Sequence, residues 1–146
     1  MKRQLVNPGP TQALYDALHF SQATRVGDMI WVSGQVGIDP ITMKPAVGME
    51  AQARLAFDNV RTVLEAAGAS LDDIAELTTY HTDLRGDMPV FGRVKDAFLT
   101  ERYPSWTAVG VPQLALPEVL VEIRVVAVVG SGSRADSGRR DRSPAR

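Results

Sequence analysis

The stretch MEAQARLAFDNVRTVLEAAGAS, residues 49–70, decides the fold because it is the clearest amphipathic helix in the chain. Apolar side chains recur along it at helical spacing and lie on one side: Met49, Ala53, Phe57, Val60, Leu64 and Ala67. Gly68 suits the position just after the last turn, where a left-handed backbone is common. The apolar side of this helix needs a partner layer, which we expect the flanking segments to supply as a sheet.

The segment before the helix predicts two strands. In FSQATRVGDMIWVSGQVGI, residues 20–38, two β-type runs flank the turn-forming residues 26–28. In the second run, alternate residues are expected to face opposite sides of the strand. One side carries the apolar or small residues Ile30, Val32, Gly34 and Val36. The other side is mainly polar and carries Trp31, Ser33 and Gln35.

The segment after the helix continues the alternation. Ser70 and Asp73 form a weak capping pair before IAELTTYHTDL, residues 74–84, a Thr-rich predicted strand. Asp87 is expected to cap a helix over residues 88–103, with Pro89 in its first turn. SWTAVGV, residues 105–111, and VLVEIRVVAVV, residues 119–129, read as two further strands.

This order, ββαβαββ, predicts an α+β domain over residues 1–129. We expect a single mixed sheet with two helices packed on one of its faces. The last strand is apolar on both faces, so the face without helices should be buried against another subunit.

Composition excludes several classes of function. The 146 residues include no cysteine, which excludes disulfides, thiolate metal sites and cysteine nucleophiles. The formal net charge of −1 gives no overall attraction for nucleic acid or an anionic membrane. No signal peptide or membrane-length apolar run is present, so a cytoplasmic protein is expected.

The C-terminal segment, residues 130–146, differs in composition from the rest of the chain. It contains only Gly, Ser, Pro, Ala, Arg and Asp, with five Arg against two Asp. It has no large apolar side chain to bury, so we expect a disordered basic tail. A tail that contacts RNA or a partner is the alternative, although the aromatic residues that stack on bases are missing.

Several stretches together resemble the RidA family, also called YjgF, of imine and enamine deaminases. They are FSQA at 20–23, VSGQVGIDP at 32–40, residues 51–74, TDL at 82–84, Pro104, and LPEVLVEI at 116–123. The resemblance implies the family's chorismate mutase-like fold and a homotrimer with a barrel-like core. It also implies a ligand cleft at each subunit interface, and hydrolysis of imines or enamines without metal or cofactor.

The resemblance also implies roles for individual residues. Glu122 matches a glutamate that orients or activates water, Ser33 and Gly34 match a strand that lines the cleft, and Phe20 replaces an aromatic residue, usually tyrosine. Trp106 falls where the family has the arginine that binds the substrate carboxylate, and an indole cannot form that ion pair. Thr107 follows at a small hydroxyl or thiol position, and Lys95 stands where many members have asparagine.

Each of these residues also has a structural interpretation. Glu122 could pair with Arg124, Ser33 could bond to a neighbouring strand, and Trp106 could pack at a subunit contact. Arg93, Arg102 or Arg124 could replace the missing guanidinium. A metal or dyad site at His81 and Asp83 is disfavoured, because no third ligand has suitable spacing.

Three functions follow as hypotheses. The favoured one is a RidA-like hydrolase of larger or uncharged imines, in which Trp106 and Glu122 converge from neighbouring strands on one crevice between protomers. The alternative is a non-catalytic small-molecule-binding trimer that uses the same cleft. A role directed at RNA is the third, and only the tail favours it.

Overall fold

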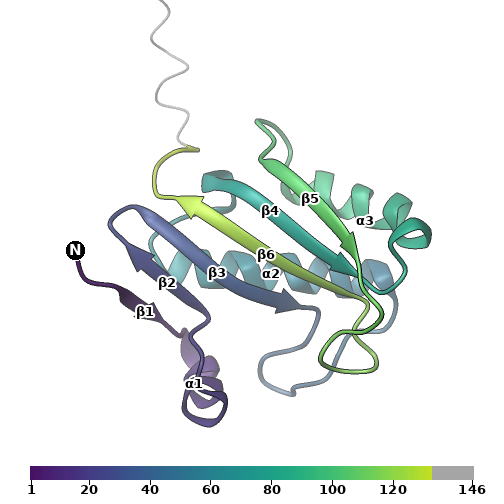
Figure 1. The fold of residues 1–146 in the computed structure, drawn as a ribbon, viewed down its shortest axis with the longest axis horizontal. Helices are drawn as coiled ribbons and strands as arrows, with labels where there is room; N and C mark the ends of the chain where they lie inside the picture. The colour runs from purple at the N-terminus through teal and green to yellow at the C-terminus, as the bar shows by residue number, and fades with distance from the viewer. Residues whose placement is uncertain (133–146) are drawn as a thin grey trace, which may run out of the picture.

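The computed structural model describes residues 1–132, and the expected basic tail lies mostly outside these residues. The described part is one sheet of six strands with helices (Figure 1). The strands are β1 (Gln4–Val6), β2 (Ala23–Val26), β3 (Met29–Val36), β4 (Ile74–His81), β5 (Ser105–Gly110) and β6 (Val121–Val128). The helices are α1 (Gln12–Leu18), α2 (Met49–Ala66) and α3 (Leu84–Phe98), with 3-10 turns η1 (Gly9–Thr11) and η2 (Leu71–Asp73).

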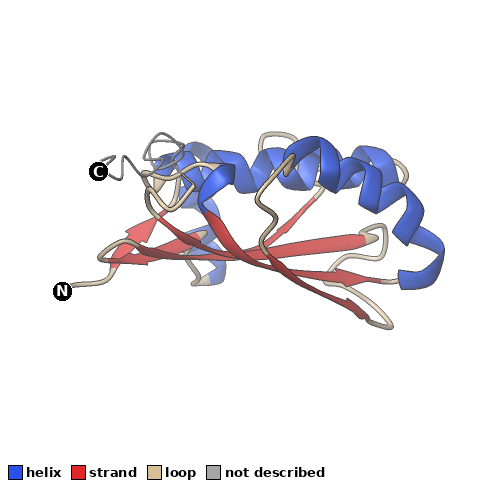
Figure 2. Ribbon diagram, turned by 90° about the horizontal axis from the view of Figure 1, so that it is seen from above, coloured by secondary structure: helices blue, strands red, loops and turns tan. Residues whose placement is uncertain are grey.

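The sheet order is β1-β2-β3-β6-β4-β5. Strands β4 and β5 are parallel, and every other neighbouring pair is antiparallel. Figure 2 shows the two long helices, α2 and α3, over one face of the sheet, as the sequence predicts. Among residues 1–132 the opposite face, which we call the open face, carries no helix of comparable length.

The core lies between α2, α3 and the sheet. On α2 the predicted apolar side is confirmed, since Ala53, Phe57, Val60 and Leu64 are fully buried. On β6 alternate residues, Val121, Ile123, Val125 and Ala127, are buried in the same cluster. The intervening residues of β6, which include Glu122 and Arg124, therefore face the open side.

The ends of two elements are capped by aspartates. The backbone N–H of Ser70 donates to Asp73 Oδ2 at 3.1 Å, which agrees with the predicted capping pair. Helix α3 begins one turn earlier than predicted, because Asp83 caps it and accepts from the Gly86 N–H at 3.3 Å. Asp87 lies inside the helix, and Pro89 is in its second turn rather than its first.

A β-bulge in β3 overturns the predicted parity of that strand. Val32 pairs with Val125 and Gln35 pairs with Ile123, so two residues, Ser33 and Gly34, oppose Arg124 alone. Beyond the bulge Gln35 is buried on the helix side, and Val36 lies opposite Glu122. A prediction from strict alternation takes no account of the extra residue in a bulge. It therefore placed Gln35 on the wrong face of the sheet.

The N-terminal β1, η1 and α1 were not predicted, since β1 has three residues and α1 has seven. Asn7 fixes this segment, because its side-chain oxygen accepts from the Gln22 backbone N–H at 3.0 Å.

No helix in residues 1–132 is both long and apolar enough to cross a bilayer.

Candidate functional site

Glu122 lies on the open face, where its carboxylate packs directly on the backbone of Gly34. A Cβ atom added at Gly34 would collide with the Glu122 carboxylate, so any other residue there would force this side chain to move. The β-bulge explains this contact, because it places residues 33 and 34 together beside β6. The sequence placed both residues in the site, and the structure brings them into contact.

The environment of Glu122 favours proton transfer chemistry. Burial raises the pKa of its carboxyl group above the ordinary value. Within residues 1–132 it forms no ion pair, and the four pairs found there involve other side chains. The suggested structural pair between Glu122 and Arg124 is therefore not formed, although both residues face the open side.

Ser33 precedes Gly34 in β3, and Phe20 lines a cavity together with Gly34. The Ser33 hydroxyl donates to the Ser21 carbonyl at 2.7 Å, which matches the structural interpretation of this residue. Phe20 is 39% exposed and, with Gly34, lines a cavity of about 190 Å³. This cavity lies between the N-terminal segment, β3 and α2, and Glu122 does not line it.

Trp106 belongs to a separate cluster on the helix side of β5. Its indole N–H donates to Thr79 Oγ1 at 3.0 Å, and its ring lies 5.9 Å from that of Phe91 on α3. Thr79 in turn lies 2.8 Å from Nε2 of His81, which is fully buried. Burial lowers the pKa of His81, so its imidazole is neutral at neutral pH. Sequence reasoning did not identify Thr79, whose position in a Thr-rich strand gave no distinguishing signal.

Lys95 is the cation of this cluster. Its Nζ atom lies 5.0 Å from the centroid of the Trp106 ring and 5.5 Å from that of Tyr103. The same atom pairs with Asp96 at 2.9 Å. A positive charge therefore stands beside the indole, although it comes from α3 rather than from the strand.

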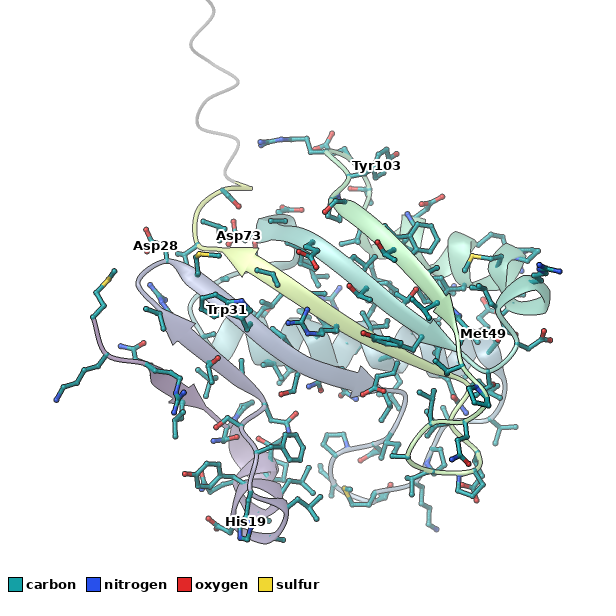
Figure 3. The ribbon with its side chains drawn as sticks, in the orientation of Figure 1. His19, Asp28, Trp31, Met49, Asp73 and Tyr103 are labelled. Atoms are coloured by element: carbon teal, nitrogen blue, oxygen red, sulfur yellow. The ribbon has the colours of Figure 1, made fainter. Side chains whose placement is uncertain are left out.

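Within one protomer, Trp106 and Glu122 do not share a crevice, and the expectation that they converge is wrong at this level. Trp106 pairs in parallel register with Leu77, which is fully buried under the helices. Glu122 lies between the core residues Val121 and Ile123 and points the other way. Figure 3 looks onto the open face, on which Trp31 is labelled.

The remaining candidates divide between the two sides. Thr107 follows Trp106 and pairs with Thr78, which is opposite Arg124, so this row lies on the open face with Glu122. Arg93 is exposed on α3, and Arg102 donates to the Ser131 carbonyl at 3.4 Å. Of the three arginines, Arg124 alone shares a strand and a face with Glu122.

Comparisons with known proteins identify the family and agree with the fold. A family profile described as endoribonuclease L-PSP matches residues 10–129. The RutC family protein YjgH of Escherichia coli K12 is 41% identical over 128 residues, which cover 87% of this chain and 95% of that protein. A 2-iminobutanoate/2-iminopropanoate deaminase of Salmonella typhimurium is 35% identical over 112 residues, covering 75% and 86%. A solved structure of protein YJGH superposes with a TM-score of 0.80 at 39% identity, covering 88% of this chain and 98% of that one.

Proposed function

Because the chain belongs to the endoribonuclease L-PSP family, whose RidA (YjgF) members it resembles, we propose that it hydrolyses reactive imines or enamines. The relatives named 2-iminobutanoate/2-iminopropanoate deaminase support this reaction class. The products are a carbonyl compound and ammonia.

The observation that carries the proposal is the Glu122 carboxylate, which is half-buried, packed on Gly34 and without an ion pair among residues 1–132. Its pKa is raised by burial, which makes it a better proton acceptor than an exposed glutamate. A positioned acid or base of this kind contributes roughly 10²- to 10⁴-fold in rate.

The proposed steps balance without a metal or an organic cofactor. Glu122 accepts a proton from water as the water oxygen bonds to the imine carbon, and the C=N π electrons move to nitrogen, which takes up a proton from solvent. The C–N bond of the resulting carbinolamine then breaks as Glu122 returns its proton to the nitrogen, and ammonia leaves. The carbinolamine hydroxyl releases its proton to solvent as its oxygen forms the carbonyl group, so that Glu122 is ionised again.

We propose that the complete site forms between protomers of a homotrimer. One protomer would supply Glu122, Gly34, Ser33, Phe20 and Thr107 from its open face, and its neighbour would supply Trp106 and Lys95. The opposite orientations of Trp106 and Glu122 within one chain support this assignment, because Trp106 on β5 and Glu122 on β6 project from opposite faces of the same sheet.

The substrate preference is proposed to differ from that of the named deaminases. At position 106 an indole replaces a guanidinium, so a bidentate contact with a carboxylate is lost and a surface for stacking is gained. Larger or uncharged imines fit this change better than small 2-imino acids. Lys95 supplies only a point charge, already shared with Asp96.

Non-catalytic binding of a small molecule is a second candidate. The uncharged cavity next to Phe20 and Gly34 favours it, because no ionisable group of that cavity is available for proton transfer.

An assay with imines generated in situ separates the two functions. An amino acid oxidase supplies 2-imino acids, and an amine oxidase supplies imines without a carboxylate. We expect the protein to accelerate release of the carbonyl product, most strongly for large uncharged imines. No acceleration with any member of the panel would overturn the hydrolase in favour of the binding protein.

A further inference from the structure

Two glutamine side chains line the cavity beside Phe20, and their hydrogen bonds determine how each amide group is oriented. It lies between residues 8–20, the bulged end of β3 and α2, and it is lined by Gln22 and Gln35 among others. These two residues are only 5% and 7% exposed. Sequence reasoning placed Gln35 on a strand face and gave it no role.

The hydrogen bonds of Gln35 decide which atoms remain free. Its Nε2 atom donates to the Ser33 carbonyl at 3.1 Å, and a carbonyl oxygen can only accept. The same Nε2 atom lies 2.9 Å from Gln22, which must therefore present its oxygen, Oε1, at that contact. The acceptor Oε1 of Gln35 and the donor Nε2 of Gln22 are left without protein partners within residues 1–132.

Both free atoms reach accessible space. Among the described residues, the fully buried side-chain atoms that lack a partner are His81 Nδ1 and Asp87 Oδ2. Gln22 Nε2 and Gln35 Oε1 are therefore not sealed inside the protein, although their residues are more than nine-tenths buried. Both residues line this cavity, and we infer that the free donor and the free acceptor face it.

The rest of the cavity is mainly apolar and carries no formal charge. Leu14 and Phe20 come from the N-terminal segment, Met43 from the loop before α2, and Asn59 from α2. The Asn59 amide nitrogen already donates to the carbonyls of Val36 and Ile38. With about 190 Å³, the cavity exceeds the roughly 150 Å³ in which an apolar protein cavity binds benzene.

We propose that this cavity binds a small neutral molecule that carries a carboxamide or lactam group on an apolar body. The ligand carbonyl accepts from Gln22 Nε2, and the ligand N–H donates to Gln35 Oε1. A carboxylate is rejected, because it has no N–H for Gln35 and no cation in the cavity offsets its lost hydration. The cavity shares Phe20 and Gly34 with the proposed hydrolytic site, but the inference goes beyond hydrolysis and does not depend on it, since Glu122 does not line the cavity.

Calorimetric titration of the full chain tests the site with benzamide and 2-piperidinone as probes. Benzoate and acetophenone serve as comparators of similar size. We expect saturable binding of at least one amide probe, binding of benzoate at least about tenfold weaker than that of benzamide, and binding of acetophenone about 2- to 10-fold weaker. Replacing Gln22→Met should weaken benzamide and acetophenone by similar factors, since both use the same donor.

Two tryptophan variants on α1 provide a matched pair that leaves the glutamines intact. Leu14→Trp fills the cavity and should abolish binding of the amides. Leu18→Trp lies on the same helix, is 63% exposed and does not line the cavity, so it should bind like the parent.

Several results would overturn the proposal. They are no saturable binding of either amide, benzoate binding as tightly as benzamide, or equal loss in the Leu14→Trp and Leu18→Trp variants. A change of oligomeric state specific to Leu14→Trp would assign the cavity to a second copy of the chain instead. An absence of imine hydrolysis by the parent protein with amide binding intact would leave this inference standing, and imine hydrolysis without amide binding would leave the proposed function standing, so the two proposals fail separately.

Discussion

Trp106 and Glu122 project from opposite faces of the same sheet, with strand β4 between their strands. The indole is bonded to Thr79 beneath the helices, whereas the carboxylate rests on Gly34 at the open face. A site that uses both residues must therefore combine two protomers. The following predictions test each half separately.

The hydrogen bond from Trp106 to Thr79 should stabilise the junction of β4, β5 and α3. Replacing Trp106→Phe keeps a ring beside Phe91 but removes the donor to Thr79. We expect a loss of about 1 kcal/mol in the free energy of unfolding, measured by urea denaturation. Tyr103→Phe is the control, because its hydroxyl is exposed and lies 3.4 Å from its acceptor; an equal loss there would refute the specific role of the indole.

Trp106 should also set the substrate preference. In Trp106→Arg the guanidinium restores a bidentate partner for carboxylates, at the expense of the indole contacts. We expect kcat/KM for small 2-imino acids to rise relative to that for uncharged imines. Steady-state kinetics on both classes measure this ratio, and an unchanged ratio would mean that position 106 does not contact the substrate.

Substitution of Gly34 should be costly because its backbone lies against the Glu122 side chain. In Gly34→Ala the new methyl group meets the carboxylate, and we expect a destabilisation of about 1–3 kcal/mol by thermal or urea unfolding. Gly92→Ala is a matched control in the interior of α3, where an added Cβ meets nothing within 4 Å. That variant should be more stable by about 0.5–1 kcal/mol, and a comparable loss in both would contradict the contact.

Much of this arrangement could be predicted from the sequence, and the exceptions have physical causes. The long apolar periodicity of α2 identified its buried face, and Ser70 with Asp73 marked the turn before β4. The bulge at Ser33 and Gly34 could not be recognised in the alternation of apolar and polar residues, because one extra residue does not visibly interrupt it. The direction of Trp106 was also hidden, since β5 is an edge strand whose side chains are exposed on both faces.

The raised pKa of Glu122 predicts a specific dependence of stability on pH. A carboxyl group that is harder to ionise in the folded state costs stability above its folded pKa and costs none below its unfolded pKa. Glu122→Gln should therefore be more stable than the parent at neutral pH, with a difference that shrinks as the pH falls toward about 4. Urea titrations at a series of pH values measure the difference, and a difference that grows toward acid would contradict the assignment.

The most direct test of the account compares imine hydrolysis by the parent, Glu122→Gln and Glu118→Gln. Glu118 is an exposed carboxylate a few residues away, so its replacement controls for the loss of one negative charge. We measure the rate of carbonyl product formed from an uncharged imine, with folding confirmed by thermal unfolding. We expect a loss of roughly 100-fold or more in Glu122→Gln and an unchanged rate in Glu118→Gln. A parent-like rate in a folded Glu122→Gln variant would contradict it.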